Sequence, residues 1–334
     1  MILHPGILAL IGGSSVVLLM TAFAVVHGIT IVRKWDFSSS SAEQISLERK
    51  TYLVSTIMNY VLGFQVVAAL LFVSTVDDIH IQFVGAMCAT GSLNANPVGW
   101  YALCTKIVLL FLSGVWIALN HMDGRAEDFP LVRPKYILLI LLFPLLALDL
   151  SLLVRYFAGL SPDIITSCCG SLFSESGDRV ASGLASLPVF PTMVTFYGGI
   201  FLFFLVSVLC LYSGSGLLRY AMSALSLGVL FVSIAAIVSF LSVYFYELPT
   251  HHCPFDILQA GYRFVGYPIY IGLFGGTFFG ILPGCFHGLK GIATLKTTID
   301  RSERAWVHLS MGFMLGFVLV SSYPVVTGEF TLFR

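Results

Sequence analysis

Residues 137–157 read ILLILLFPLLALDLSLLVRYF, a run of 21 positions in which only Asp149 and Arg155 carry a charge. A helix needs about 20 apolar residues, at a rise of about 1.5 Å each, to cross the hydrocarbon core of a bilayer. This stretch has the required length and composition. It therefore predicts a membrane-spanning α-helix.

Seven further apolar runs of similar length occur along the chain. The 334 residues are 57% hydrophobic and 10% charged, whereas a soluble protein carries about 25% charged residues. The sequence therefore predicts an all-α, polytopic membrane protein, with a single integral-membrane helical domain over residues 1–334. The first run lacks a basic amino-terminal region and is expected to be a retained helix rather than a signal peptide. The eight expected spans are 7–32, 51–75, 99–120, 137–157, 192–213, 220–246, 264–288 and 306–327.

Lysine and arginine predict the orientation, because these residues are enriched in cytoplasmic loops. Twelve lie in the first, third, fifth and seventh connections, four lie on the opposite side, and Lys106 falls inside the third span. Both termini are therefore expected to be extracytoplasmic. The outer loops contain no N-x-S/T sequon, which favours a bacterial inner membrane. The twelve are Arg33, Lys34, Arg49, Lys50, Arg125, Arg133, Lys135, Arg219, Lys290, Lys296, Arg301 and Arg304; the four are Arg155, Arg179, Arg263 and Arg334.

Four of the seven cysteines fall in loops expected on the outer, oxidising side: Cys88, the adjacent Cys168 and Cys169 in TSCCGS, and Cys253. Adjacent cysteines seldom bond to each other. A structural interpretation therefore links Cys168 and Cys169 to Cys88 and Cys253, in one order or the other, and staples three loops into a small cap. A second interpretation is thiol–disulfide exchange coupled to a quinone between the helices. The chain has no C-x-x-C motif, which weakens this second interpretation.

A third interpretation of the outer loops is a metal site. The candidate ligands are His251, His252 and Cys253, which are consecutive, and His80. The outer side also carries His4 and the nearby acidic residues Asp77, Asp78, Glu247 and Asp256. Imidazole and thiolate together suit zinc or copper. Consecutive side chains diverge, so the three residues of the HHC run are not expected to reach one ion together.

Four other histidines, His27, His121, His287 and His308, lie near the expected cytoplasmic ends of the spans. Two histidines on facing helices can ligate a b-type haem, and an imidazole can also contact a quinone. His27 and His287 are the candidate haem pair, since both lie slightly deeper than the others. The alternative to ligand binding is that these four histidines are simply hydrated or hydrogen-bonded at the membrane interface.

Two charges are expected within the bilayer. Lys106 lies about seven residues into the third span and Asp149 about eight residues from the outer end of the fourth, which places both roughly 10–12 Å deep on antiparallel helices. Isolated charges at this depth are costly, so an ion pair between them is predicted. A proton or substrate path through Asp149 is the alternative.

The seventh span carries a stripe of glycines at every fourth position: Gly272, Gly276, Gly280, Gly284 and Gly288. Small residues at this spacing let a neighbouring helix, or a flat cofactor ring, approach closely. Close packing of helices is the expected role.

Three functions follow from these features. The first is a membrane redox component that moves electrons between the bilayer, through quinone or b-haem, and the extracytoplasmic side. The second is binding or transport of a soft metal ion, copper or zinc. The third is a cofactor-free membrane anchor whose disulfide-stapled cap docks an extracytoplasmic partner. Besides the lipid bilayer, the expected partners are an extracytoplasmic redox protein or other membrane subunits. No basic run indicates nucleic acid, and no known catalytic motif indicates an enzyme.

Overall fold

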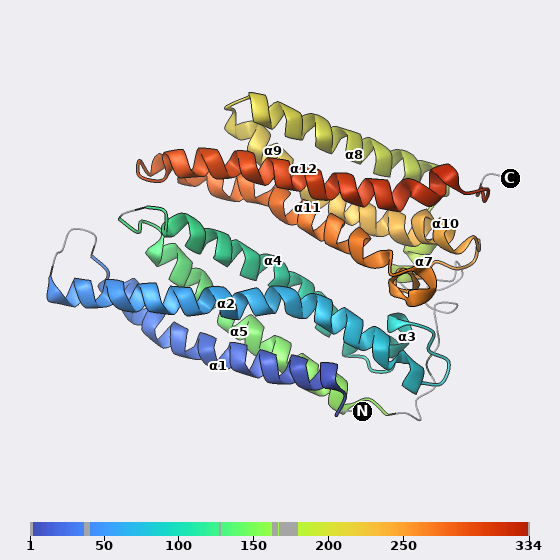
Figure 1. The fold of residues 1–334 in the computed structure, drawn as a ribbon, viewed down its shortest axis with the longest axis horizontal. Helices are drawn as coiled ribbons and strands as arrows, with labels where there is room; N and C mark the ends of the chain where they lie inside the picture. The colour runs from blue at the N-terminus through green and yellow to red at the C-terminus, as the bar shows by residue number, and fades with distance from the viewer. Residues whose placement is uncertain (1–2, 37–40, 127, 162–165, 167–179, 333–334) are drawn as a thin grey trace. The chain divides into compact units, whose positions relative to one another are not determined.

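The computed structural model describes residues 3–36, 41–126, 128–161, 166 and 180–332. Within these residues, eight helices are long and apolar enough to cross a membrane, which confirms the predicted all-helical fold with eight candidate spans (Figure 1). They are α1 (Pro5–Lys34), α2 (Ala42–Asp78), α4 (Gly99–Asp123), α5 (Val132–Ala158), α8 (Val189–Tyr212), α9 (Gly216–Ala236), α11 (Gly266–His287) and α12 (Lys296–Thr327).

Helix α9 does not stop at Ala236 but continues through η2 (Ile237–Leu241), a π-helical turn, into α10 (Ser242–Tyr246). Together these elements make the span Gly216–Tyr246. A π turn shifts the backbone hydrogen bonds by one residue, and such turns are frequent near functional sites. Here the carbonyl oxygen of Val238 lies 2.9 Å from Nδ1 of His252, which belongs to the loop that follows.

The chain forms two compact units, and the single helical domain expected from the sequence stays a prediction. Unit 1 comprises Met1–Val84, Ser92–Ile164 and Ile292–Thr298, and unit 2 comprises Gly85–Gly91, Ile165–Gly291 and Ile299–Arg334. In unit 1, α1 packs on α2 and α5, and α4 packs on the same two helices. This arrangement is a four-helix bundle. Unit 2 contains α8, α9 and α11, with α9 packed between the other two, and most of α12.

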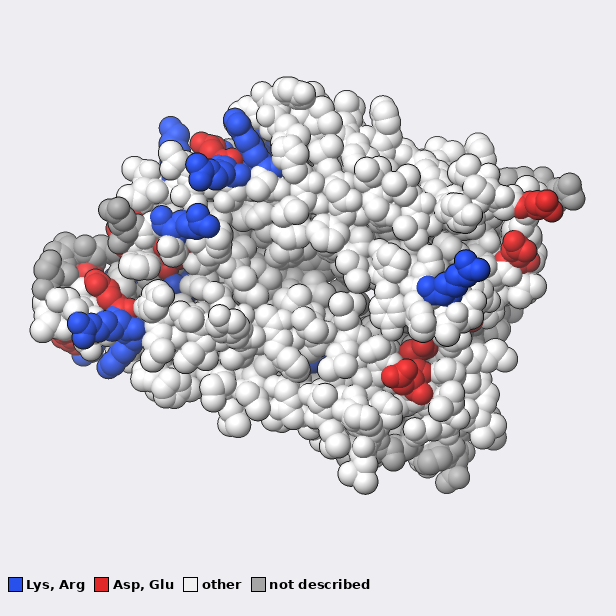
Figure 2. Space-filling view, in the orientation of Figure 1, with Lys and Arg blue, Asp and Glu red and all other residues white. Residues whose placement is uncertain are grey.

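The helix surfaces are apolar, as the bilayer requires. Large hydrophobic side chains such as Phe201, Phe231 and Leu319 are exposed rather than buried. On the face drawn in Figure 2, most of the surface carries neither basic nor acidic side chains. Because hydrocarbon offers no partner for polar groups, such surfaces are stable against lipid and unstable in water. Contact with a lipid bilayer follows from this composition.

The glycine stripe of α11 is covered by two helices of unit 2. A Cβ atom added at Gly272 would lie 3.0 Å from the backbone of Phe313 in α12. One added at Gly280 would lie 2.2 Å from Oγ of Ser226 in α9 and 3.0 Å from Oγ of Ser310 in α12. The stripe therefore serves close packing of helices.

Helix α11 also contains Pro283, which cannot donate a backbone hydrogen bond. Ser223 of α9 compensates for the break. Its Oγ donates to the carbonyl oxygens of Gly280 and Ile281, at 3.2 and 2.9 Å, and accepts from the N–H of Gly284 at 2.9 Å. Small residues on both helices permit this contact between a side chain and the backbone of a neighbouring helix.

We expect Gly280→Ala to destabilise the protein by about 1–3 kcal/mol, the usual cost of overpacking a close contact. Thermal unfolding of the purified protein in detergent measures this effect. Gly312→Ala in α12 is the matched control, because a Cβ there meets no atom within 4 Å. It should leave the midpoint unchanged or raise it slightly. Equal midpoints for the two variants would contradict close packing at the stripe.

Candidate functional site

Cysteines from two distant parts of the sequence meet in unit 2. Sγ of Cys88, in the segment Gly85–Gly91, lies 3.4 Å from Sγ of Cys253, in the loop after α10. This distance is van der Waals contact, because a disulfide bond measures about 2.05 Å. Both side chains are fully buried. The structure therefore brings together two of the four cysteines that the sequence predicts to lie in outer loops.

A carboxylate completes the cluster. One ligand atom each from Cys88, Cys253 and Asp256 lie within 4.8 Å of one another, and all three residues are buried. Asp256 begins the short helix η3 (Asp256–Leu258). Its Oδ2 lies 2.5 Å from Nε2 of His251, whereas its Oδ1 is buried and has no hydrogen-bond partner among the described residues. We call Cys88, Cys253 and Asp256 the cysteine–aspartate cluster.

Neighbouring groups fix the position of Cys253. The N–H of Phe255 donates to its sulfur at 3.4 Å, and Oγ1 of Thr90 lies 3.5 Å away from the same atom. The Tyr246 hydroxyl at the end of α10 donates to the Cys253 carbonyl oxygen at 2.5 Å and accepts from the N–H of Ile257 at 3.1 Å. Hydrogen bonds that donate to sulfur favour the thiolate form, which is the form that binds metals.

Two acidic groups of the cluster act on a neighbouring tyrosine. Tyr262 lies in η4 (Ala260–Tyr262), and its ring packs 4.9 Å from that of Tyr246. Burial raises the pKa of Tyr262, and the nearby charges of Asp256 and Cys253 raise it further. Among the described residues, the basic group that contacts Asp256 is His251. A cation placed between the sulfurs and the carboxylate would neutralise this charge.

The other predicted metal ligands take different positions. His252 is buried, and its Nδ1 contacts the carbonyl oxygen of Val238 in the π-helical turn η2. Its Nε2 has no hydrogen-bond partner among the described residues. His80 belongs to unit 1, and its Nδ1 contacts the carbonyl oxygen of Asp77. Of the three residues in the HHC run, Cys253 alone supplies a ligand atom to the cluster. His251 contacts the carboxylate of Asp256 instead.

Cys168 and Cys169 lie outside the described residues. Thr166, two positions earlier, is described, and its carbonyl oxygen lies where a side chain at Gly85 would project. Gly85 has a φ of 84°, a conformation that favours glycine. The beginning of the TSCCGS segment therefore lies against the segment that carries Cys88.

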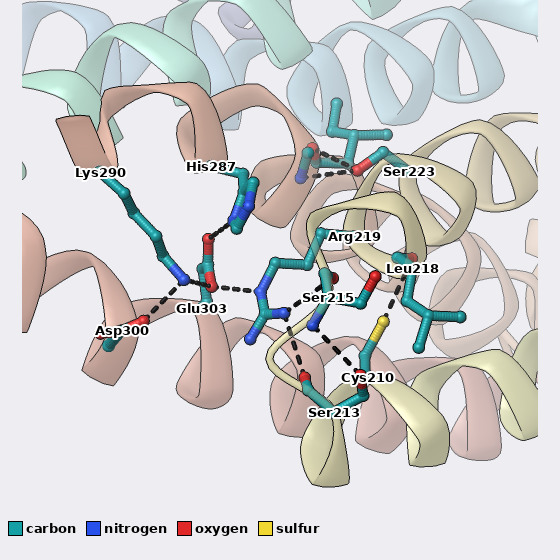
Figure 3. Close-up of polar contacts among 12 residues, drawn as sticks. Cys210, Ser213, Ser215, Leu218, Arg219, Ser223, His287, Lys290, Asp300 and Glu303 are labelled. Carbon is teal, nitrogen blue, oxygen red and sulfur yellow. Dashed lines mark hydrogen bonds and ion pairs between the residues drawn. The ribbon is translucent and has the colours of Figure 1, made fainter.

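His287, a predicted haem ligand, takes part in a charged network of unit 2 (Figure 3). Its Nδ1 lies 3.0 Å from Oε1 of Glu303. Oε2 of the same carboxylate contacts Nε of Arg219 and lies 2.7 Å from Nζ of Lys290, which also pairs with Asp300 at 2.6 Å. Glu303 is only 1% exposed. One ring nitrogen of His287, Nδ1, is therefore in contact with the Glu303 carboxylate.

The remaining histidines are dispersed. His27 packs edge-on against Phe23 in unit 1, with ring centroids 4.4 Å apart. Nδ1 of His308 contacts the carbonyl of Arg304 within α12, and the residue is exposed. His121 lines a pocket in unit 1. Haem ligation by His27 and His287 stays a prediction.

Among the described residues of unit 1, two ion pairs are buried, and the sequence predicts one of them. Nζ of Lys106 lies 2.7 Å from Oδ2 of Asp149, as predicted, and both side chains are buried. The second pair joins Lys135 and Asp123 at 2.6 Å, and it is equally buried. Both residues lie at helix ends, where a charged side chain ordinarily reaches water. The sequence does contain a signal for this pair: Asp123 and Lys135 carry opposite charges and lie on either side of the short connection between α4 and α5.

Comparisons with known proteins add no family to this picture: no protein-family model matches the chain, and neither a curated protein nor a solved structure is found to be similar.

Proposed function

We propose that this multi-pass membrane protein binds a soft metal ion through Cys88, Cys253 and Asp256. The observation that carries the proposal is the buried cluster itself, with three ligand atoms from three side chains within 4.8 Å of one another. Within the part of the chain that the structure describes, the buried Oδ1 of Asp256 has no hydrogen-bond partner. A buried carboxylate oxygen without a partner is costly, and coordination of a cation removes that cost.

The ligand types select the class of metal. Two thiolates and one carboxylate carry three negative charges, and thiolates prefer zinc or copper over calcium or magnesium. The His251 ring would orient the carboxylate from the second coordination sphere, an arrangement common in metal sites. The distribution of lysine and arginine supports placing this centre on the extracytoplasmic side, with both termini outside the cytoplasm. The lack of an N-x-S/T sequon in the outer loops supports a bacterial inner membrane.

Metal analysis of the full-length protein, purified in detergent without chelators, tests the proposal. We expect about one zinc or copper ion per chain. Cys253→Ser and Asp256→Asn should lose most of the metal while remaining folded. Cys285→Ser is the matched control, because Cys285 is an exposed cysteine of α11 in the same unit and lies outside the cluster. Wild-type protein that holds no metal, and takes up none after reduction and incubation with zinc, would refute the proposal.

A second candidate function, a redox component, is favoured by the contact between the two sulfur atoms. Two thiols at this separation can form a disulfide when they lose two electrons and two protons to an oxidant such as a quinone. Counting thiols before and after reduction of the metal-free protein distinguishes the candidates. Reversible formation of a Cys88–Cys253 disulfide supports redox chemistry, whereas stable links from these residues to Cys168 and Cys169 support the stapled cap.

A further inference from the structure

Unit 1 contains a pocket that has no role in the proposed function. Its volume is about 340 Å³, at the lower end of the range for small-molecule sites. It lies between the amino-terminal half of α2 and the carboxyl-terminal half of α4, and it shares no residue with the cysteine–aspartate cluster. The lining residues on which the argument depends are Trp35, Thr51, Tyr52, Asn59, His121 and Lys135.

Two polar atoms of the pocket wall lack a partner. Oγ1 of Thr51 and Oδ1 of Asn59 are buried, and neither makes a hydrogen bond to any residue that the structure describes. Thr51 is only 3% exposed. Both side chains belong to α2, two helical turns apart, and both line the pocket. Since buried polar atoms are nearly always paired, these two indicate a ligand with hydrogen-bonding groups.

The charge at the pocket is largely balanced by the protein itself. Nζ of Lys135 lies 2.6 Å from Asp123 and 3.0 Å from Oδ1 of Asn120, which leaves one N–H of the ammonium group for a ligand. Glu48 faces the pocket together with Arg125. A site with paired charges favours a neutral ligand with acceptor oxygens over an anion.

Aromatic side chains supply the remaining surface. Trp35, Tyr52 and Phe129 line the pocket. Phe129 has a φ of 45°, a left-handed conformation that is rare for bulky residues and recurs at ligand sites. Aromatic walls favour a planar ring, which they hold by stacked or edge-on contacts. On α2, Tyr52, Leu53 and Tyr60 are exposed beside the pocket and form an apolar surface that lipid would cover.

We propose that the pocket binds the head group of a membrane quinone or a closely similar neutral ring with carbonyl oxygens. The Thr51 hydroxyl and the Lys135 ammonium group donate to such carbonyls, and the Asn59 carbonyl accepts from the hydroxyl of the reduced form. The apolar tail lies along the exposed face of α2. His121, one of the histidines that the sequence offered for a quinone contact, lies at this pocket.

Binding of ubiquinone-1 to the full-length protein in detergent tests the inference, with quenching of tryptophan fluorescence as the readout. Trp35 lines the pocket and Trp116 donates to the backbone of Lys135, so both report on it. We expect saturable binding to the wild-type protein. The double variant Thr51→Val with Asn59→Leu should bind about tenfold more weakly, the effect of losing one or two hydrogen bonds.

Thr75→Val is the matched control, because Thr75 is a buried threonine of the same helix whose hydroxyl is already bonded to Leu71. Its affinity for the quinone should equal that of the wild type. Tyr52→Ala, at an exposed position, provides a second variant should the double variant not fold, and we expect weaker binding there too. Unchanged affinity in Tyr52→Ala and in a folded double variant would overturn the inference. Binding of an anionic phospholipid, with no binding of ubiquinone-1, would also overturn the inference, in favour of a lipid head group.

Discussion

Replacing Asp149 by asparagine is expected to lower the free energy of unfolding by about 3–5 kcal/mol, the usual cost of removing one partner of a buried ion pair. Lys106 is fully buried, and its Nζ has Asp149 as its charged partner, with Oγ of Ser14 at 3.4 Å as the second contact. Gln65 also donates to the carboxylate at 3.1 Å. The variant would therefore leave a cation in the bundle core without a counter-charge. Thermal unfolding in detergent measures the loss.

The double variant Lys106→Met with Asp149→Leu is the matched control for this prediction. Removing both charges replaces a desolvated pair by apolar groups, which is often neutral or stabilising. We therefore expect the double variant to unfold close to the wild-type midpoint, well above the single variant. A harmless Asp149→Asn change would contradict the pair seen in the structure, and a double variant less stable than the single one would assign the pair a packing role.

The eight spans and the first ion pair could be predicted because each depends on local sequence. A run such as 137–157 is apolar throughout, and Asp149 is conspicuous within it. Depth along a helix follows from residue counting alone, so Lys106 and Asp149 could be placed opposite each other. The prediction failed for charges at helix ends. Lys135 was counted as a loop residue, yet in the structure it is buried against Asp123.

The cysteine–aspartate cluster could be predicted only in part. The sequence placed Cys88 and Cys253 on the same side of the membrane and noted Asp256 nearby. It did not predict that Cys88 and Cys253 contact each other, because that contact depends on how two loops fold back on unit 2. The divergence of consecutive side chains was correctly anticipated: His252 faces Val238 while Cys253 faces the cluster.

The charged network of unit 2 was missed for a related reason. The sequence predicts Arg219 and Lys290 as basic residues of cytoplasmic loops and gives no signal for Glu303. In the structure, Arg219 closes the turn between α8 and α9 by donating to the carbonyl oxygens of Ser213 and Ser215, at 3.2 and 3.1 Å. Arg219 also contacts Glu303, which lies 84 positions later in the sequence. A pair this far apart in the sequence cannot be predicted from local sequence patterns.

Glu303→Gln is expected to destabilise unit 2 by about 3–5 kcal/mol, because the carboxylate is the shared partner of three basic side chains. Arg219 is only 6% exposed, and glutamine would leave its guanidinium without a buried counter-charge. Lys290 would keep Asp300, whereas His287 would lose its acceptor carboxylate. Because Arg219 also ties α8 to α9, the loss should reach the connection between these helices (Figure 3).

Two measurements test Glu303→Gln. Thermal unfolding should show a lower midpoint, and limited proteolysis should show faster cleavage of the α8–α9 connection, between Tyr212 and Gly216. Glu43→Gln is the control, because Glu43 pairs with Lys34 on the exposed surface of unit 1. Exposed pairs contribute little to stability, so this variant should unfold at the wild-type midpoint. The double variant Arg219→Leu with Glu303→Leu removes both buried charges, so it should be more stable than Glu303→Gln. If Glu303→Gln leaves midpoint and cleavage rate unchanged, Arg219 and Lys290 are solvated, and the network does not hold this end of unit 2 together.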